Sequence, residues 1–357
     1  MPQLTTLQPM RPTNPTVRVN ELLHLVVERP DPNAAKPFLM DFGLRIAREE
    51  HHVLYLRATG PSAYCYRVQR GPRPRFLGLG LAVASRQDLE SLANLPGASP
   101  IQTSPHPGGG EVVVLTDPSG FLVEAVFGHE RVPSLPSRPP LPANLGGHPT
   151  RINVTQRSPR SPPEVLRLGH LVLEVANFQA TCRWYTEHFG LLPSDVQVLP
   201  DGSPAVVFLR LDLGDVPADH HTIAIAQGFA PAFGHSAFEV VDADAVGMGQ
   251  RMLQQRGFRH AWGIGRHVLG SQIFDYWADP WGAKHEHYCD GDVFTADVPM
   301  GVHAVSREAM AQWGPPMPAS FTRPRITLSN LIAMVHHLRT SPDLTLSKLI
   351  TLARIFA

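Results

Sequence analysis

The sequence predicts an α+β protein made of two similar halves followed by a helical tail. Each half opens with an apolar, β-rich run, at residues 22–27 and 168–173. Each half also closes on an Asp-Pro-x-Gly turn that leads into a strand containing a glutamate, at residues 117–124 and 279–286. A proline-rich stretch separates the halves, with nine prolines between positions 131 and 163. An internal repeat joined by a stiff linker indicates two domains of one design.

Composition limits the class of protein before any motif is considered. With 357 residues, the chain is long enough for about two domains of ordinary size. It carries 31 lysines and arginines against 31 acidic residues, so no positive excess is available to neutralise the phosphates of a nucleic acid. Hydrophobic residues make up 43% of the chain, which is too much for a disordered protein. We therefore expect a globular protein with no nucleic-acid partner.

The cysteines and the N-terminal residues indicate the compartment. Cys65, Cys182 and Cys289 are far apart and form no Cys-x-x-Cys pair. This spacing excludes a disulfide framework and a thiolate zinc site, and it is typical of a reducing compartment. The first residues lack a basic stretch followed by an apolar core, and no apolar run approaches the roughly 18 residues of a membrane span. We therefore expect a cytoplasmic protein with no membrane partner.

Proline content and the repeat divide the chain into five segments. Each half contains two β-α units and short antiparallel strands, and the residues after the second half form an extension of their own. The predicted segments are an N-terminal tail (1–15), an N-terminal domain (16–130), a proline-rich linker (131–163), a C-terminal domain (164–300) and a C-terminal extension (301–357).

Helical spacing is clearest in the second half and in the extension. An apolar face predicts a helix over residues 178–189, and a second helix is expected to begin at Asp242 or Asp244, to end near Arg256 and to be stopped by Gly257. The extension has apolar residues at helical spacing in two stretches, which we interpret as one or two amphipathic helices that dock on the body or on a partner subunit. The apolar positions are Phe178, Cys182, Tyr185 and Phe189 in the first helix, and Leu328, Leu331, Val335, Leu338 and residues 344–356 in the extension.

Three residues of the second half are candidate metal ligands: His170, His235 and Glu286. Each is placed on a different predicted strand, and the repeat puts all three at corresponding edges of one module. Two neutral imidazoles and one carboxylate on one face, with the opposite face open, is the arrangement favoured for non-haem Fe(II).

Strand alternation separates these ligands from their neighbours. His285 and His287 flank Glu286 and must point to the opposite face of the strand. Glu174 and Glu239 share a face with the two histidines, but four residues along a strand span about 13 Å, which is too far to reach the same ion. We expect these two glutamates lower in the cavity or at its rim.

The second half resembles the catalytic domain of the type I extradiol (catechol meta-cleaving) dioxygenases, in the vicinal-oxygen-chelate (glyoxalase/bleomycin-resistance/dioxygenase) superfamily. The most specific match is the run from Gly265 to Glu286, with a histidine, a tyrosine nine residues later, then Asp-Pro-x-Gly and the glutamate. Shorter matches begin at Gly169, His221 and Gly234. The resemblance implies two tandem domains, each of paired βαβββ modules in the vicinal-oxygen-chelate fold.

The resemblance also implies roles for single residues. His170, His235 and Glu286 would bind Fe(II), or Mn(II) as in some members. His221 would be the acid/base residue beside the O₂ site, and His267 and Tyr276 would hydrogen-bond the oxygens of a bound catecholate. The implied activity is insertion of both atoms of O₂ into a catecholic ring, in the catabolism of aromatic compounds, by an enzyme that is often a homo-oligomer.

Other functions of the superfamily stay open from the sequence. A metal-dependent isomerase or lyase of the glyoxalase or fosfomycin-resistance type shares the fold, as does a non-enzymatic small-molecule-binding protein. The N-terminal half keeps His24 and Glu124 at the repeat positions but has no histidine in its middle strand, residues 76–83. We therefore expect no metal in that half. The pattern does not indicate the substituent on the catechol ring.

Overall fold

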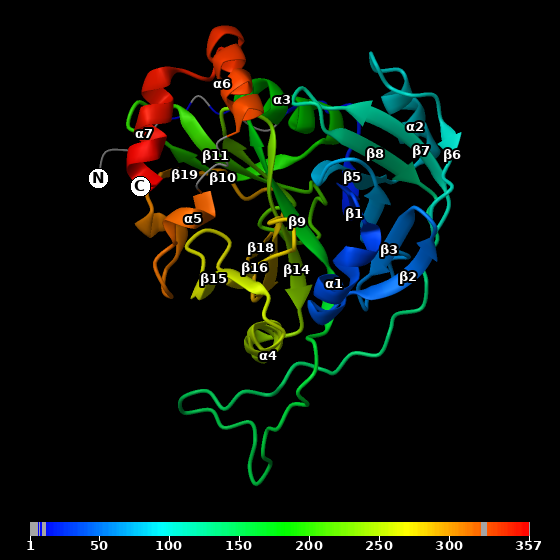
Figure 1. Cartoon of the computed structure of the whole chain (residues 1–357), viewed down its shortest axis with the longest axis vertical. Helices are drawn as coiled ribbons and strands as arrows, with labels where there is room; N and C mark the ends of the chain where they lie inside the picture. The colour runs from blue at the N-terminus through cyan, green and yellow to red at the C-terminus, as the bar shows by residue number, and fades with distance from the viewer. Residues whose placement is uncertain (1–5, 7, 9–11, 323–326, 357) are drawn as a thin grey trace.

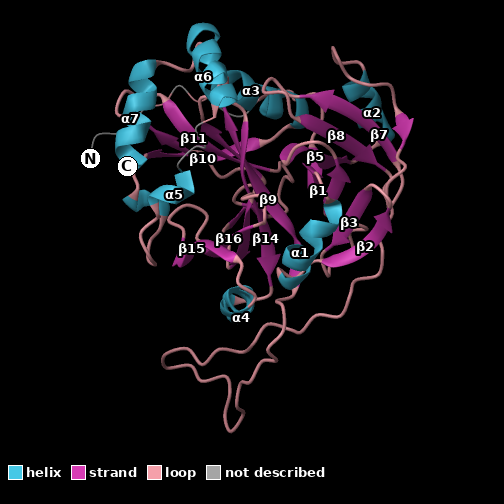
Figure 2. Cartoon of the chain, viewed as in Figure 1, coloured by secondary structure: helices cyan, strands magenta, loops and turns pink. Residues whose placement is uncertain are grey.

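The computed structural model describes residues 6, 8, 12–322 and 327–356, so most of the predicted N-terminal tail and Ala357 lie outside the described residues. Two large β-sheets lie side by side, one from each half of the chain (Figure 1). Helices pack around the two sheets (Figure 2). The predicted α+β class is therefore confirmed.

The first sheet is formed by the N-terminal half. Among the described residues it has eight strands in the order β2-β3-β4-β1-β5-β8-β7-β6. The strands are β1 (Val19–Arg29), β2 (Arg45–Glu50), β3 (Val53–Arg57), β4 (Tyr66–Arg70), β5 (Arg75–Val83), β6 (Gln102–Thr103), β7 (Glu111–Thr116) and β8 (Leu122–Phe127). The helices of this half are η1 (Pro32–Ala35), α1 (Lys36–Asp41) and α2 (Arg86–Ala93).

The second sheet carries the predicted metal ligands. In the described part of the chain it has nine strands in the order β15-β16-β17-β14-β9-β13-β11-β10-β19, and β12 and β18 form a small separate pair. The strands are β9 (Val165–Val175), β10 (Leu192–Val198), β11 (Pro204–Arg210), β12 (Ala218–Asp219), β13 (Ile223–Gln227), β14 (Ala232–Val240), β15 (Arg259–Arg266), β16 (Ile273–Ala278), β17 (Lys284–Cys289), β18 (Val293–Phe294) and β19 (Gly301–Ala304). The helices of this half are α3 (Phe178–Phe189) and α4 (Ala243–Gln255).

The two helices of the second half begin and end where their capping residues predict. The apolar face of α3 is buried, and Gly190 follows it with φ of +71°, a left-handed conformation that suits glycine. The side chain of Asp242 accepts a hydrogen bond from the backbone N–H of Ala245 at the start of α4. Arg256 then caps the last turn and Gly257 adopts φ of +76°.

The two halves pack against each other through one continuous hydrophobic core. Polar contacts fix the orientation of the two halves against each other. The guanidinium of Arg29 donates to Asp279 at 2.8 Å, with both side chains buried. His287 donates from Nε2 to the backbone oxygen of Phe42 at 2.6 Å, and its ring stacks on Phe42. His285 and His287 therefore face the N-terminal half, as strand alternation predicts.

Residues 131–163 form the long loop at the bottom of Figure 1, without a regular helix or strand. Arg138 ties this loop to the C-terminal half, because its guanidinium forms two hydrogen bonds with the carboxylate of Asp242. The same carboxylate caps α4, so loop and helix are anchored together.

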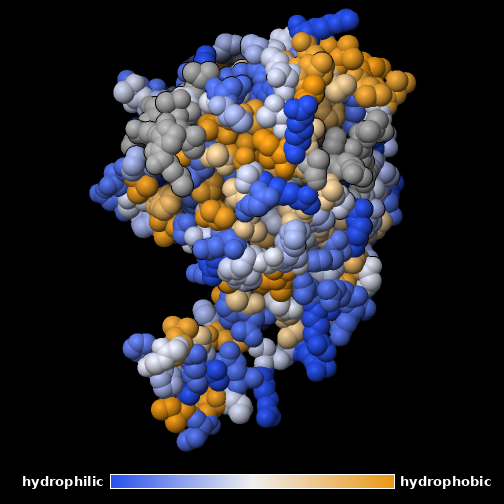
Figure 3. All heavy atoms as spheres, turned by 90° about the vertical axis from the view of Figure 1, so that its left-hand side faces the viewer, coloured by the Kyte–Doolittle hydropathy of each residue, from blue (hydrophilic) through white to orange (hydrophobic). Residues whose placement is uncertain are grey.

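The C-terminal extension begins as part of the second sheet and then covers it. β19 pairs in parallel with β10, so the first residues of the predicted extension add an edge strand. The following elements are η2 (Glu308–Met310), α5 (Ala319–Thr322), α6 (Leu328–Thr340) and α7 (Leu346–Phe356). Apolar side chains of α6 are exposed, and apolar surface gathers at the top of the face in Figure 3. Among the described residues, no helix is both long and apolar enough to cross a bilayer.

Candidate metal centre

The three predicted ligands come together because of the register of three neighbouring strands. His170 of β9 lies opposite Ala237 of β14, and Ala237 lies opposite Glu286 of β17. His235 is two residues before Ala237, so it projects from the same face of the sheet. Small Ala237 leaves the space between the longer side chains on either side open.

The ligand atoms of His170, His235 and Glu286 all lie within 4.8 Å of one another. The Nε2 atoms of His170 and His235 are each 3.3 Å from the same oxygen of Glu286. Glu286 is fully buried, yet neither of its carboxylate oxygens has a hydrogen-bond partner among the described residues. A buried carboxylate without partners is costly, so this arrangement fits a cation held by two imidazole nitrogens and one carboxylate oxygen.

The ionisation of the cluster also suits a metal. Burial is the main cause that lowers the pKa of His235 to about 4, which keeps its imidazole neutral. Burial opposes ionisation of Glu286, but the neighbouring imidazoles of His170, His235 and His267 outweigh it and hold the pKa well below its ordinary value. A neutral imidazole and an ionised carboxylate are the forms that bind metals.

His267 and Tyr276 form a hydrogen-bonded pair beside the cluster. Tyr276 of β16 lies directly opposite Glu286, and its hydroxyl is 2.8 Å from Nε2 of His267. The other ring nitrogen of His267, Nδ1, donates to the backbone oxygen of Met310 at 2.8 Å. Because a carbonyl can only accept, this contact places a proton on Nδ1. When that is the only proton on the ring, Nε2 accepts from the hydroxyl of Tyr276. Burial, and then Glu286, raise the pKa of Tyr276 well above its ordinary value.

His221 lies on the wall next to the cluster, just before β13. Its ring centroid is 4.0 Å from that of His170, and its Nδ1 is 2.9 Å from Nδ1 of His220. Burial, followed by the neighbouring His170 and His220, lowers the pKa of His221 well below its ordinary value. His221 borders the cavity whereas His220 does not.

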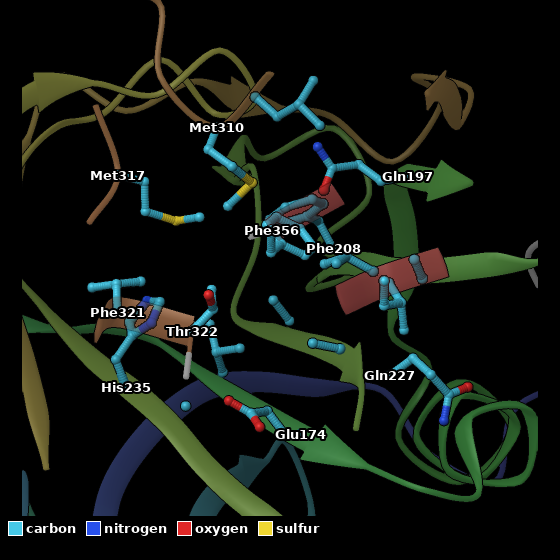
Figure 4. Close-up of a pocket in the computed structure, with 18 of the residues that line it drawn as sticks. Glu174, Gln197, Phe208, Gln227, His235, Met310, Met317, Phe321, Thr322 and Phe356 are labelled. Atoms are coloured by element: carbon cyan, nitrogen blue, oxygen red, sulfur yellow. The ribbon is translucent and has the colours of Figure 1, made fainter. Parts of the chain in front are cut away.

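A cavity of about 490 Å³ opens in front of these residues (Figure 4). One wall comes from the second sheet, and the opposite wall comes from the C-terminal extension. Five of the six predicted site residues line it, and the sixth, Glu286, is in contact with His170 and His235 behind them. The residues contributed by the extension are Ala309, Met310, Met317, Ala319, Phe321, Thr322, Leu349, Leu352, Ala353 and Phe356.

Of the two glutamates predicted in the cavity or at its rim, Glu174 lines the cavity away from the ligand cluster. The prediction for Glu239 is wrong, because this side chain does not line the cavity and pairs with Arg167 at 2.6 Å instead. His260 contacts Asp275 at 2.7 Å and does not line the cavity. The wall residues of the extension were not predicted, because nothing in a tail with helical spacing indicates which surface it covers.

The corresponding place in the N-terminal half is filled by protein. His24 contacts Glu124 at 2.9 Å, and Arg67 donates to both oxygens of the same carboxylate. The position equivalent to His235 is Gly78, which pairs with Leu122 of β8 as His235 pairs with Lys284 of β17, so this half has no second imidazole there. The guanidinium of Arg67 thus supplies the positive charge that Glu124 needs, which supports the prediction that this half holds no metal.

Residues 167–286 match the family model described as Glyoxalase/Bleomycin resistance protein/Dioxygenase superfamily. The chain is 31% identical over 325 residues to metapyrocatechase 2 from Cupriavidus necator, and the match covers 87% of this chain and 93% of that protein. It is 27% identical over 194 residues to an iron-dependent extradiol dioxygenase from Rhodococcus jostii, covering 51% of this chain and 56% of that protein.

Solved structures share the fold. The Mn(II)-bound glyoxalase from Novosphingobium aromaticivorans has a TM-score of 0.72 at 24% identity, covering 87% of this chain and 97% of that chain. An extradiol ring-cleaving dioxygenase from B. fuscum has a TM-score of 0.72 at 19% identity, covering 90% of this chain and 87% of that chain. Structural likeness at such identities establishes the architecture of two tandem domains with paired βαβββ modules.

Proposed function

Because this chain belongs to the type I extradiol, ring-cleaving dioxygenases of the glyoxalase/bleomycin resistance protein/dioxygenase superfamily, we propose that His170, His235 and Glu286 hold its catalytic Fe(II) ion. The observation that carries this proposal is the buried carboxylate of Glu286, which has no hydrogen-bond partner among the described residues and lies 3.3 Å from two imidazole nitrogens. The donor set is the one favoured for non-haem Fe(II), and Mn(II) is the second choice for the same ligands. The enzyme inserts both atoms of O₂ into a catecholic ring.

When bound, a divalent ion with one carboxylate ligand supplies a residual positive charge and open positions for the two catechol oxygens and for O₂. The remaining work falls to the residues around it. His267 and Tyr276 lie where they can hydrogen-bond a catechol oxygen, and the Nδ1–H of His267 is held by the carbonyl of Met310. The pair is thereby pre-oriented, which favours one pose of the ring.

His221 is the acid/base residue in this proposal. Its ring is neutral because burial and the adjacent imidazoles oppose a positive charge, and it borders the cavity next to His170. A neutral imidazole can accept a proton from a substrate hydroxyl and return it to a later oxygen anion.

Apolar side chains make up much of the wall of the cavity and limit the water around these residues. Phe208 and Val172 cover the sheet side, and Met317 and Phe321 cover the side of the C-terminal extension. Exclusion of water strengthens each electrostatic contact and protects reactive species from hydrolysis.

We infer further that the metal site belongs to a C-terminal domain of residues 164–300 and that residues 16–130 form a metal-free domain. Arg67 at the carboxylate of Glu124 supports this division. The proposed cytoplasmic location is supported by the three free and buried cysteines, Cys65, Cys182 and Cys289. A homo-oligomeric state stays a prediction.

Oxygen consumption tests the proposed function. Protein purified anaerobically and loaded with Fe(II) is expected to consume O₂ with catechols and to form yellow semialdehydes by cleavage next to the hydroxyl pair. Absence of O₂ uptake with Fe(II) and with Mn(II) across a broad panel of catechols would overturn it. Isomerisation of hemithioacetals without O₂ would support the glyoxalase-type alternative instead.

A further inference from the structure

The cavity is larger than a bare catechol needs. Its volume of about 490 Å³ lies in the range of about 300–1,000 Å³ that encloses drug-sized ligands, whereas catechol is a single ring with two hydroxyl groups. The proposed metal ligands stand on β9, β14 and β17, which are neighbours near the middle of the sheet order. The cavity continues from there over β13, β11 and β10.

The wall over these three strands is uncharged. Its lining residues are Gln197, Ala205, Val206, Phe208, Ala224, Ala226 and Gln227. The amide of Gln227 is already used by the protein, because its nitrogen donates to the backbone oxygens of Val175 and Ala176 and its oxygen accepts from Lys348. The amide oxygen of Gln197 has no hydrogen-bond partner among the described residues and is the one polar acceptor that this wall leaves open. Small alanines at three of these positions leave the volume open.

Helix α7 closes this part of the cavity from the opposite side. Leu349, Leu352 and Phe356 line it, and Leu352 and Phe356 pack against the cluster of Leu199, Ala205 and Val305. Phe356 also packs against the cluster that contains Tyr276. The same side chain therefore extends from the catalytic end of the cavity to the apolar end.

The charged residues of the lining do not suit an anionic substituent. Lys284 donates from Nζ to the backbone oxygen of Phe321 at 2.8 Å and lies 4.3 Å from the centroid of its ring. The only other formally charged residue of the lining in the described part of the chain, apart from histidines, is Glu174, which repels anions.

We propose that the part of the cavity between β10, β11, β13 and α7 is a subsite for an uncharged apolar substituent, so that the substrate is an alkyl- or aryl-substituted catechol. This proposal rests on the proposed function, since the catechol ring itself is held at the metal ligands. It names the substrate class that the sequence alone does not indicate.

A substrate series tests the subsite on the Fe(II)-loaded enzyme. The value of kcat/KM is expected to rise by about fourfold for each methylene group added from methyl- to butylcatechol, which is the effect of burying one such group. The value of kcat/KM for dihydroxyphenylacetate is expected to be about tenfold or more below that for ethylcatechol, because the carboxylate loses its hydration without gaining a partner. Turnover of catechol without any gain along the series overturns the subsite, whereas no turnover of any catechol overturns the proposed function.

Matched variants locate the subsite. Leu352→Asn is expected to remove most of the gain for butylcatechol, while Ile350→Asn, on an exposed face of the same helix, is expected to leave it unchanged. Ala226→Leu narrows the cavity and is expected to lower kcat/KM for butylcatechol about tenfold or more, with catechol itself within about twofold. Equal effects of Leu352→Asn and Ile350→Asn, or equal effects of Ala226→Leu on both substrates, contradict the assignment.

A second inference comes from a chain of hydrogen bonds behind His221. Nε2 of His220 is 2.6 Å from one oxygen of Asp195, and Nε2 of His303 is 2.7 Å from the other oxygen. Asp195 is on β10 and His303 is on β19, the strand that the C-terminal extension adds. Gly301 pairs with Asp195, and a Cβ atom at Gly301 would lie 2.1 Å from the oxygen that contacts His303.

The direction of these hydrogen bonds follows from their partners. The carboxylate of Asp195 can only accept, and hydrogen bonds from His220 and His303 outweigh burial and lower its pKa, so His220 carries its proton on Nε2. His220 is almost fully buried between Phe208 and Phe294. When His220 carries one proton, on Nε2, its Nδ1 accepts from Nδ1–H of His221. This hydrogen bond leaves Nε2 of His221 without a proton.

We infer that Asp195 and His220 are positioning residues that hold His221 in the tautomer with a free electron pair on Nε2. Neither residue touches the substrate cavity or the metal ligands. They act through His221, the residue that the proposed function makes the acid/base group. The C-terminal extension contributes His303 to this series of hydrogen bonds.

Kinetics of Asp195→Asn separate positioning from a structural role. In the Fe(II)-loaded enzyme this variant is expected to lower kcat by about tenfold to a hundredfold, with KM for catechol within about twofold and iron content unchanged, because the interaction matters only when the proton moves. The control Asp201→Asn removes an exposed carboxylate from the turn after the same strand and is expected to have no effect.

Combination with His221→Phe gives a second readout. If Asp195 acts through His221, Asp195→Asn has less than about a twofold further effect on kcat in the His221→Phe background. A full additional loss in that background overturns the inference. So does a loss of iron or of folded protein that accounts for the whole effect of Asp195→Asn in the native background.

Discussion

At the scale of single residues, Glu124 and Glu286 occupy equivalent places in the two halves. Each buried carboxylate needs a compensating positive charge, and the source of that charge differs between the halves. Each carboxylate is buried next to a histidine. Glu124 is neutralised by the guanidinium of Arg67, whereas the described residues place no arginine or lysine against Glu286. We therefore assign the metal to the second half, where a bound ion would supply the positive charge that Arg67 supplies in the first half.

His221→Phe tests the acid/base role. We expect kcat for catechol at saturating O₂ to fall by about a hundredfold, because the cavity loses its proton acceptor while the ring volume is kept. Iron content, measured by metal analysis, is expected to equal that of the unmodified enzyme, because His221 is not one of the clustered ligands. A kcat within about threefold of the unmodified value would remove His221 from the mechanism.

Some residues of the site could be predicted and others could not. His170, His235 and Glu286 were accessible because each falls at a repeat position on a strand with known alternation. Met310 was not, because its contact with His267 joins residues 43 positions apart through a backbone oxygen, which any residue type provides. Asp195 was missed because its partners come from separate elements and no spacing links them.

At the scale of elements, one row of side chains crosses five strands. His170, Ala237, Glu286, Tyr276 and Trp262 lie opposite one another on β9, β14, β17, β16 and β15. The rings of Tyr276 and Trp262 are stacked 5.7 Å apart. The register of the sheet, rather than a flexible loop, therefore sets the spacing of the proposed metal ligands and of Tyr276.

Ala237→Leu tests the importance of this row. A larger side chain between His170 and Glu286 occupies the space where their ligand atoms converge, so we expect iron content to fall about tenfold or more. Overpacking also costs about 1–3 kcal/mol of stability, measured by urea unfolding. The control is Ala232→Leu, at the exposed start of the same strand, which is expected to retain its iron. Full iron content in the Ala237→Leu variant would contradict the geometry.

Helix ends were predictable to within a residue or two, whereas the role of the extension was not. Capping residues Asp242 and Gly257 act locally, so the sequence around α4 contains what determines its ends. The position of α7 depends on apolar contacts with Leu199 and Ala205, far away in the chain. Amphipathic spacing predicts a helix, but it does not indicate the surface on which the helix packs.

At the scale of the whole molecule, the two halves are locked by buried polar contacts. Asp279 belongs to the turn before β17, and its carboxylate accepts from Trp281 and Ala283 as well as from Arg29 of the other half. The Asp-Pro-x-Gly turn that occurs in both halves therefore also joins the two halves at its second occurrence, next to the strand that holds Glu286.

Asp279 predicts a pH dependence of stability. Burial opposes its ionisation, but His285 and Arg29 outweigh burial and lower its pKa to about 2 from an ordinary 3.8. A pKa that is lower in the folded state gives stability that is complete above about pH 4 and is lost as the pH falls toward 2. Its share is on the order of 2 kcal/mol, at about 1.4 kcal/mol per pH unit.

Urea unfolding of metal-free protein between pH 6 and pH 2.5 measures this share. Asp279→Asn is expected to be less stable than the unmodified protein at pH 6, and the difference is expected to shrink as the pH falls. A constant difference over the whole range would show that ionisation of Asp279 does not stabilise the packing of the two halves.

Iron content after anaerobic loading tests the assignment of the metal ligands most directly. We expect one Fe(II) ion per chain in the unmodified protein and in Glu174→Gln, which alters a glutamate of the same cavity outside the cluster. We expect iron close to zero in Glu286→Gln, with the circular dichroism spectrum of the folded protein preserved. Equal iron in the two variants would contradict the assignment of His170, His235 and Glu286 as the ligands.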